Sequence, residues 1–179
     1  PVVCPPPQID DIFINEVLID PDGNEQSLKT EFIELANPTS NPINLGGIGL
    51  YYDNELQFTF PEGCFAGRSL VAIYHQKPSI EWIWSSPESD KERFDFISTR
   101  SFTLRNSGIT LELRTADGLT TLTRFNSDEV QQRNPEAEVE SGQSLTRAID
   151  GDASAVFILH PPSPATCRNG YLYETGCSN

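Results

Sequence analysis

The chain has 179 residues and a mass of 19.9 kDa, which fits one domain with a substantial hydrophobic core. Twelve basic residues against 26 acidic residues give a formal net charge of −14, which makes nucleic acid and anionic membrane surfaces unfavourable partners. The 14 prolines and 12 glycines indicate many short strands and turns, so composition predicts an all-β fold. No run of 18 apolar residues predicts a membrane-spanning helix.

The cysteines predict disulfides rather than a metal centre. They are Cys4, Cys64, Cys167 and Cys177. They have no CxxC spacing and only two histidines accompany them, which argues against zinc. An even count predicts two disulfides formed in an oxidising compartment. Of the three possible pairings we favour Cys4 with Cys64 and Cys167 with Cys177.

The order of segments predicts three parts. Residues 1–11 form a proline-rich N-terminal arm, residues 12–160 a β-sandwich with an insertion at 76–100, and residues 161–179 a disulfide-closed loop. Because the chain starts at Pro1 and lacks methionine, we expect a secreted form without its signal peptide, located outside the cell or on its surface.

Residues 12–19 predict the first strand. Strict alternation places Ile12, Ile14 and Leu18 on one face and Phe13, Val17 and Ile19 on the other. Apolar residues on both faces indicate a strand inside the sandwich.

Further strands are expected at a spacing of about ten residues, which is typical of a sandwich or barrel. They fall at 31–37, 48–52, 57–60 and 68–75, in a three-stranded meander over 101–125, and in a pair around the turn AIDGDAS. Residues 127–142 are acidic and lack apolar periodicity, so we expect a surface loop or at most one helical turn.

An acidic loop after the first strand is the candidate cation site. Asp20, Asp22, Asn24 and Glu31 occupy positions 1, 3, 5 and 12 of a calcium-loop pattern. Glu25 stands at the sixth position, where an EF-hand needs glycine, and the flanks predict strands. The alternatives are therefore an irregular Ca²⁺ loop and a solvated acidic turn.

A second acidic cluster has the same two interpretations. Asp150 and Asp152, with Glu140 nearby, form either an ordinary turn or a set of cation ligands, and the two clusters would share an ion if the first and last strands were neighbours.

Polar residues inside the strands need partners if they are buried. For Asn15, Glu16 and Glu34 we expect a loop backbone or an arginine such as Arg147 to supply them, and a catalytic role is the minor alternative.

Two tryptophans and two histidines complete the candidates. Trp82 and Trp84 would either stack on a sugar ring or cap the core beneath the insertion. His75 and His160 are expected on the surface. Without a GxSxG motif or a Ser, His and Asp set, the sequence supports no hydrolase, and we predict no enzyme.

Five segments in order resemble the lamin tail domain of bacterial secreted proteins, over roughly residues 12–160. They are INEVLIDPDG, EFIELANPTSNPINLGG, FTFPEG, FTLRNSGITLELRTADG and SGQSLTRAIDGD. The resemblance implies an immunoglobulin-like β-sandwich that serves for interaction or anchoring, with no catalytic residues to carry over. Ile48 and Gly49 in place of a bulky aromatic, the 76–100 insertion and the cysteine loop depart from the family pattern, so a lamin binding surface is not transferred.

Two functions follow as expectations. The first is a non-catalytic extracellular module for protein–protein contact, with self-assembly into a filament or surface layer if the arm lies along the sheet edge of a neighbouring copy. The alternative is an adhesion domain that binds carbohydrate through Trp82 and Trp84 with Ca²⁺ at the acidic loop.

Overall fold

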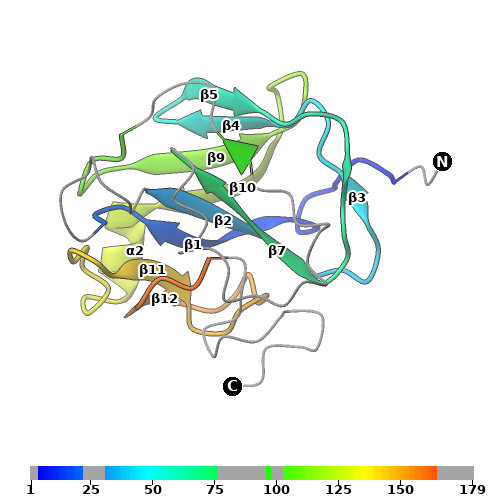
Figure 1. Cartoon of the computed structure of the whole chain (residues 1–179). Helices are drawn as coiled ribbons and strands as arrows, with labels where there is room; N and C mark the ends of the chain where they lie inside the picture. The colour runs from blue at the N-terminus through cyan, green and yellow to red at the C-terminus, as the bar shows by residue number, and fades with distance from the viewer. Residues whose placement is uncertain (1–3, 22–30, 76–95, 98–102, 165–179) are drawn as a thin grey trace.

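The computed structural model is a β-sandwich of two sheets with a short two-stranded ribbon beside them (Figure 1). It describes residues 4–21, 31–75, 96–97 and 103–164. The expected immunoglobulin-like, all-β fold is confirmed. Within the predicted insertion, only Phe96–Ile97 is described. Residues 98–102 and the tail with Cys167 and Cys177 also lie outside the described residues.

The larger sheet has the strand order β12-β11-β1-β2-β7-β8. Its strands are β1 (Phe13–Leu18), β2 (Phe32–Asn37), β7 (Ser69–Tyr74), β8 (Phe96–Ile97), β11 (Ser144–Arg147) and β12 (Phe157–His160). Only β7 and β8 pair in parallel among the described strands. The first strand is therefore internal, as its two apolar faces predicted.

The smaller sheet has the order β10-β9-β4-β5 and the ribbon pairs β3 with β6. These strands are β3 (Ile43–Asn44), β4 (Gly49–Tyr52), β5 (Glu55–Thr59), β6 (Cys64–Phe65), β9 (Thr110–Arg114) and β10 (Thr121–Asn126). The expected three-stranded meander is wrong in its first member, because residues 103–105 form no strand and β9 pairs with β4 on its other side.

The faces predicted for β1 are wrong. Ile12, Ile14, Val17 and Ile19 all enter the main core, whereas Phe13 and Leu18 pack in separate clusters. A β-bulge between Ile14 and Glu16 inserts one extra residue opposite β2. The bulge shifts the alternation by one position, so strict period-two reasoning fails beyond it.

The N-terminal arm is held by its own domain. Cys4 forms the predicted disulfide with Cys64 across 60 residues. The carbonyl oxygen of Pro5 accepts a 2.7 Å hydrogen bond from the Asn44 amide, and Pro7 is buried. Residues 4–8 are therefore extended without joining a strand, as three consecutive prolines require.

A helix replaces the loop expected after β10. α2 (Ser127–Arg133) has seven residues, about two turns. The Asn126 side chain caps it by accepting from the Glu129 amide at 3.0 Å, acidic residues occupy the first turn and Arg133 the last, and Val130 is buried. No described helix is long and apolar enough to cross a membrane.

Candidate functional site

The predicted calcium residues are only partly described. Asp22 and Asn24 lie outside the described residues, as do Trp82 and Trp84. Asp20 is half-buried and its carbonyl oxygen accepts from the Gly142 amide at 2.7 Å. In the described part of the chain, no group of three His, Cys, Asp or Glu side chains has the geometry to hold a metal ion.

Glu31 contacts the protein interior. Its carboxylate accepts from the Leu104 amide at 3.0 Å and lies 3.5 Å from Nδ1 of His75. The side chain of His75 is only 16% exposed, so the expectation of an ordinary surface histidine is wrong for this residue. Glu31 and His75 connect the start of β2 to the end of β7.

Asn15, the residue at the bulge, connects two buried carboxylates. Its amide nitrogen donates to Glu34 at 2.8 Å and to Asp150 at 3.1 Å, and its oxygen accepts from the Gly151 amide at 3.2 Å. Asp150 therefore belongs to an internal network, although the sequence placed it in a solvent-facing turn. β1 is a neighbour of the final hairpin through its pairing with β11.

Glu16 is fully buried and accepts hydrogen bonds on both carboxylate oxygens. Oε1 accepts from the Ser144 hydroxyl and from the Ser163 amide at 2.9 Å, and Oε2 accepts from the Ser163 hydroxyl at 2.9 Å. Burial raises the pKa of Glu16 from 4.5 to about 7; the serine hydrogen bonds oppose this rise and the Asp150 charge adds to it. The loop-backbone partners predicted for Asn15 and Glu16 are thus present at Gly151 and Ser163.

The predicted partner Arg147 is not used by these residues. Its guanidinium lies over the Phe157 ring, 4.2 Å from the centroid, and donates to the Ala155 carbonyl at 2.6 Å. It faces a different part of the molecule, which is the strongest candidate for a functional site.

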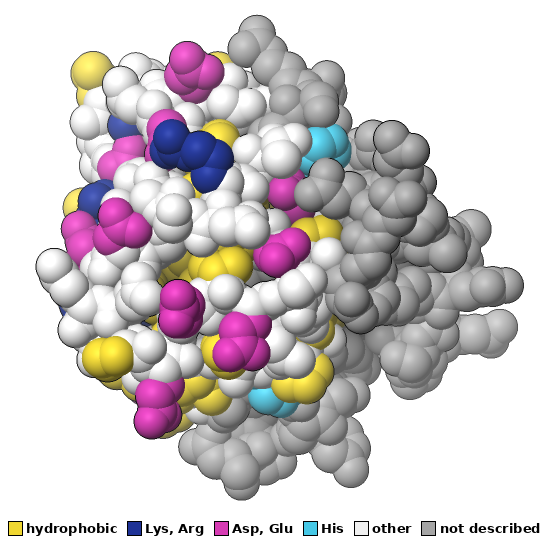
Figure 2. Space-filling model, turned by 90° about the vertical axis from the view of Figure 1, so that its left-hand side faces the viewer, with side chains coloured by type: hydrophobic (Ala, Val, Ile, Leu, Met, Phe, Trp, Pro, Cys, Tyr) yellow, Lys and Arg dark blue, Asp and Glu magenta, His cyan; other side chains and the backbone are white. Residues whose placement is uncertain are grey.

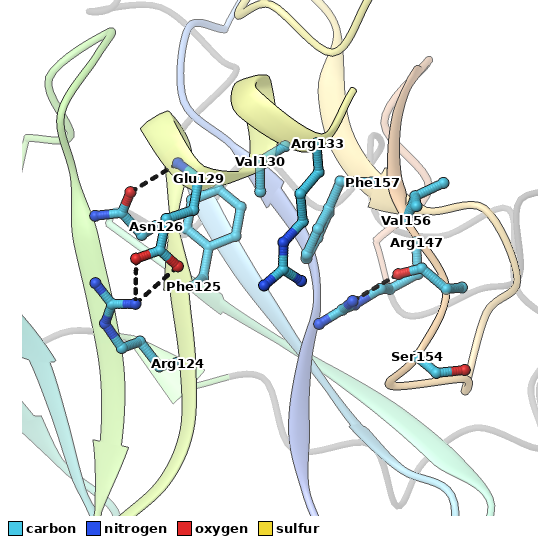
Figure 3. A pocket seen from close by; sticks show the side chains of 11 residues that line it. Arg124, Phe125, Asn126, Glu129, Val130, Arg133, Arg147, Ser154, Val156 and Phe157 are labelled. Atoms are coloured by element: carbon cyan, nitrogen blue, oxygen red, sulfur yellow. Dashed lines mark hydrogen bonds and ion pairs between the residues drawn. The ribbon is translucent and has the colours of Figure 1, made fainter. Parts of the chain in front are cut away.

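That part is a hollow of about 90 Å³ where the edges of the two sheets meet beside α2 (Figure 3). β10 and α2 form one wall, and the hairpin of β11 and β12 forms the other. The lining contains Arg124, Phe125, Asn126, Glu129, Val130, Arg133, Arg147, Ser154, Ala155, Val156 and Phe157. Phe125 and Phe157 meet edge to face, 5.1 Å between centroids, and close the core beneath it.

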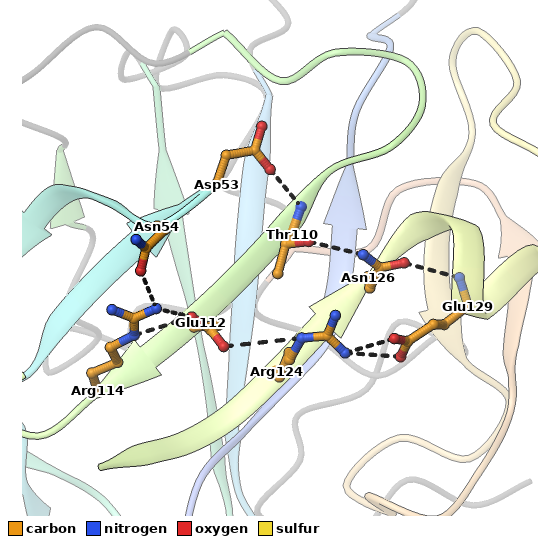
Figure 4. A network of polar contacts seen from close by, with 8 residues as sticks. All are labelled: Asp53, Asn54, Thr110, Glu112, Arg114, Arg124, Asn126 and Glu129. Atoms are coloured by element: carbon orange, nitrogen blue, oxygen red, sulfur yellow. Dashed lines mark hydrogen bonds and ion pairs between the residues drawn. The ribbon is translucent and has the colours of Figure 1, made fainter. Parts of the chain in front are cut away.

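Of the three arginines in this pocket, Arg124 is the one whose charge is balanced by carboxylates in contact with it. Its Nη1 donates to both carboxylate oxygens of Glu129, at 2.8 and 2.9 Å, and its Nε lies 3.9 Å from Glu112 (Figure 4). Glu112 also pairs with Arg114, which donates to Asn54 at 2.7 Å. This network fixes the outer face of the smaller sheet and holds α2 against β10.

Arg133 and Arg147 contact no carboxylate in the described part of the chain. Neither forms an ion pair within 4 Å in the described chain, and Figure 3 shows both guanidinium groups reaching into the hollow. Nε of Arg147 is buried without a hydrogen-bond partner. The pKa of Arg147 is lowered to about 10, mainly by burial; the Asp152 charge opposes this shift and the Arg133 charge adds to it.

The lining of the pocket is positively charged, although the molecule as a whole is negatively charged. Acidic side chains are scattered over the face shown in Figure 2 and basic ones are few. In the lining, three arginines face one carboxylate, a formal charge of +2 in a chain of −14. A second hollow of about 220 Å³ contains Asp128 and Glu138, and Asp128 already accepts from the Gly108 amide.

Sequence reasoning missed Arg124 and Arg133. The sequence does contain the pattern of a short helix that ends at Arg133. Asn126 is a typical helix cap, two acidic residues follow it, and Arg133 stands seven positions after the cap, where a cation favours the C-terminal end of a helix. Nothing in the local sequence indicates that Arg147, from a hairpin 14 residues later, points into the same space.

Comparison with protein-family models places the chain beside a known family. The family model described as Lamin Tail Domain matches residues 5–135, more than half of the chain. A search of curated proteins found no match. The matched region includes β10 and α2 but ends before β11 and β12, so the hairpin wall of the pocket lies beyond it.

Proposed function

Because the chain belongs to the lamin tail domain family, a non-enzymatic immunoglobulin-like family of interaction domains, we propose that it is an extracellular module that binds proteins and catalyses no reaction. The observation that carries this proposal is the arginine pocket. It is a surface hollow with an apolar floor and two arginines that form no ion pair in the described chain. The hydroxyl of its described lining, Ser154, donates to Asp152 within a turn and not to a histidine.

The buried carboxylates support the same conclusion. Glu16, Glu34 and Asp150 would be the natural candidates for acid–base chemistry, but their described hydrogen bonds connect β1 to β2 and to the final hairpin. They therefore contribute to holding the larger sheet together.

The extracellular location is supported by the Cys4–Cys64 disulfide, which persists in an oxidising compartment and is rarely kept in a reducing cytosol. Thiol labelling of the protein taken directly from its producing cells tests this point. We expect Cys4 and Cys64 to resist alkylation until a reductant is added, and free thiols in the native protein would contradict the location.

Self-association is the form of protein binding that a single purified chain can test. Since residues 4–8 are held against their own domain, contact between copies would use strands at the edges of the described sheets, such as β5, β10 and β12, instead of the arm. Copies of charge −14 repel each other, so we expect any association to strengthen as salt screens that repulsion.

Sedimentation velocity over a wide concentration range, at low and high salt, is the direct measurement. Concentration-dependent assembly supports binding between copies. A strict monomer, together with no partner found by covalent cross-linking on the outer surface of the producing cells, would overturn the proposed function.

A further inference from the structure

We propose that the arginine pocket binds a single carboxylate, presented beside an apolar side chain by an acidic segment of a partner protein. This inference rests on the proposed function and specifies the chemistry of the partner. The hollow between α2 and the β11–β12 hairpin is the binding site, and Arg133 and Arg147 are its two recognition residues.

Both arginines have N–H donors without an acceptor in the described chain. Arg147 donates one N–H to the Ala155 carbonyl, and its Nε–H is buried without an acceptor. Arg133 forms no described hydrogen bond or ion pair, so its planar fork of N–H donors is available. A carboxylate between the two guanidiniums accepts from both, which is the geometry for which arginine is suited.

The electrostatics point in the same direction. Two neighbouring guanidiniums repel each other, and burial of Arg147 without a carboxylate in direct contact costs free energy that the more distant Asp152 offsets only in part. The stacking of Arg147 on Phe157 keeps its charge in the pocket despite that cost. A bound anion reduces both penalties, because it screens the repulsion and supplies a counter-charge in direct contact.

The size and the floor of the hollow select the kind of anion. A space of about 90 Å³ holds one compact oxyanion and not a chain of them. Phe125, Val130 and Phe157 line the floor, and Val156, half exposed at the rim, offers contact to an aliphatic neighbour. Glutamate or aspartate next to an apolar residue matches this combination.

A long polyanion does not match it. Glu129 stands in the lining and Asp152 acts on Arg147 from the adjacent turn, so negative charges surround the two cations. Hydrogen bonds from Ser154 lower the pKa of Asp152, which keeps it ionised. These carboxylates and the net charge of −14 repel sulfated glycans and nucleic acids while leaving room for one carboxylate.

Side-chain NMR of the full chain tests the inference with two blocked peptides, acetyl-Val-Glu-Val-amide and its Gln counterpart. We expect the Glu peptide to shift the Nε–Hε resonances of Arg133 and Arg147 saturably, and the Gln peptide to leave them in place. Inorganic phosphate, a second source of a compact oxyanion, should compete with the Glu peptide.

Variants separate the pocket from general charge attraction. Arg133→Gln, at an exposed position, should weaken binding of the Glu peptide about tenfold, as loss of a charge-assisted hydrogen bond implies. Arg105→Gln removes the same charge from an exposed arginine that pairs with Asp53, and should leave the affinity unchanged. Arg147→Lys keeps the charge but removes Nε and the planar fork, and should also weaken binding.

Three results with the peptides would overturn the inference: equal weakening by Arg133→Gln and Arg105→Gln, equal binding of the Gln peptide, or no binding of the Glu peptide at all. A fourth concerns the protein partner. If Arg133→Gln leaves association with a protein partner intact, the carboxylate assignment fails and the interaction function stands. If no protein partner or self-association is found, the interaction function fails by its own test.

Discussion

Replacing the buried Glu16 by glutamine should change how stability depends on pH. Glu16 is fully buried in β1, opposite Glu34 in β2, with Ser144 and Ser163 as hydrogen-bond donors and the Asp150 charge nearby. Glutamine has the same shape and stays neutral, so Glu16→Gln imitates the protonated carboxyl at every pH.

The magnitude follows from the pKa of Glu16, which is 4.5 in its ordinary state and about 7 in the fold. At about 1.4 kcal/mol for each pKa unit, this corresponds to about 3 kcal/mol of unfolding free energy. The folded state holds the proton more tightly, so the favourable contribution is complete below pH 4.5 and is lost as the pH rises through 7. Wild type and Glu16→Gln should therefore be equally stable near pH 4, and above pH 8 the variant should be more stable by about 3 kcal/mol.

Chemical denaturation from pH 4 to pH 9 measures this difference. Subtracting the wild-type curve from that of Glu16→Gln cancels the other titrating groups, and Glu138→Gln, at an exposed position, is the matched control. A difference that does not change with pH, or one that grows toward low pH, would refute the argument that burial dominates over the hydrogen bonds from Ser144 and Ser163.

Two further predictions concern stability and a third concerns the pKa of Glu16. Asn126→Ala removes the cap of α2 and should lower the unfolding free energy by about 1 kcal/mol, whereas Asn126→Ser should retain most of it; equal losses in thermal denaturation would contradict the capping role. Replacing Cys4 and Cys64 together by serine opens a link across 60 residues and should cost about 4 kcal/mol in denaturant titrations, and an unchanged midpoint would contradict it. Ser144→Ala withdraws a donor from Glu16 and should raise the pKa of Glu16 further, which carboxyl NMR would show; a lowered pKa would count against that hydrogen bond.

Much of the fold was predictable because its strands follow simple rules. β1, β2, β4 and β7 fall within one residue of the expected strand bounds, since apolar runs between Gly, Pro and Asn turns mark them clearly. The faces of β1 were not predictable. One extra residue at the bulge sends Val17 into the main core, and a pattern of period two carries no information on such an insertion.

The partners of the polar residues were predictable only in kind. The cost of burying Asn15 and Glu16 requires hydrogen bonds, and both form them. The identities come from pairing between segments more than 100 residues apart, such as Glu16 with Ser144. An arginine is a natural partner for a buried carboxylate, but Ser144 and Ser163 donate to Glu16 instead, and burial raises its pKa to about 7.

The arginine pocket is a better candidate site than the acidic loop, because in this chain an acidic cluster is less informative than a pair of arginines. With 26 acidic residues, an acidic cluster is expected by composition alone and says little about binding. Basic residues number only 12, so two unpaired arginines in one hollow are harder to explain as a solvated surface. The hollow also uses the hairpin of β11 and β12, which lies beyond the residues that the family model matches. In a strongly acidic protein, the cations that lack a partner are therefore the better guide to what it binds.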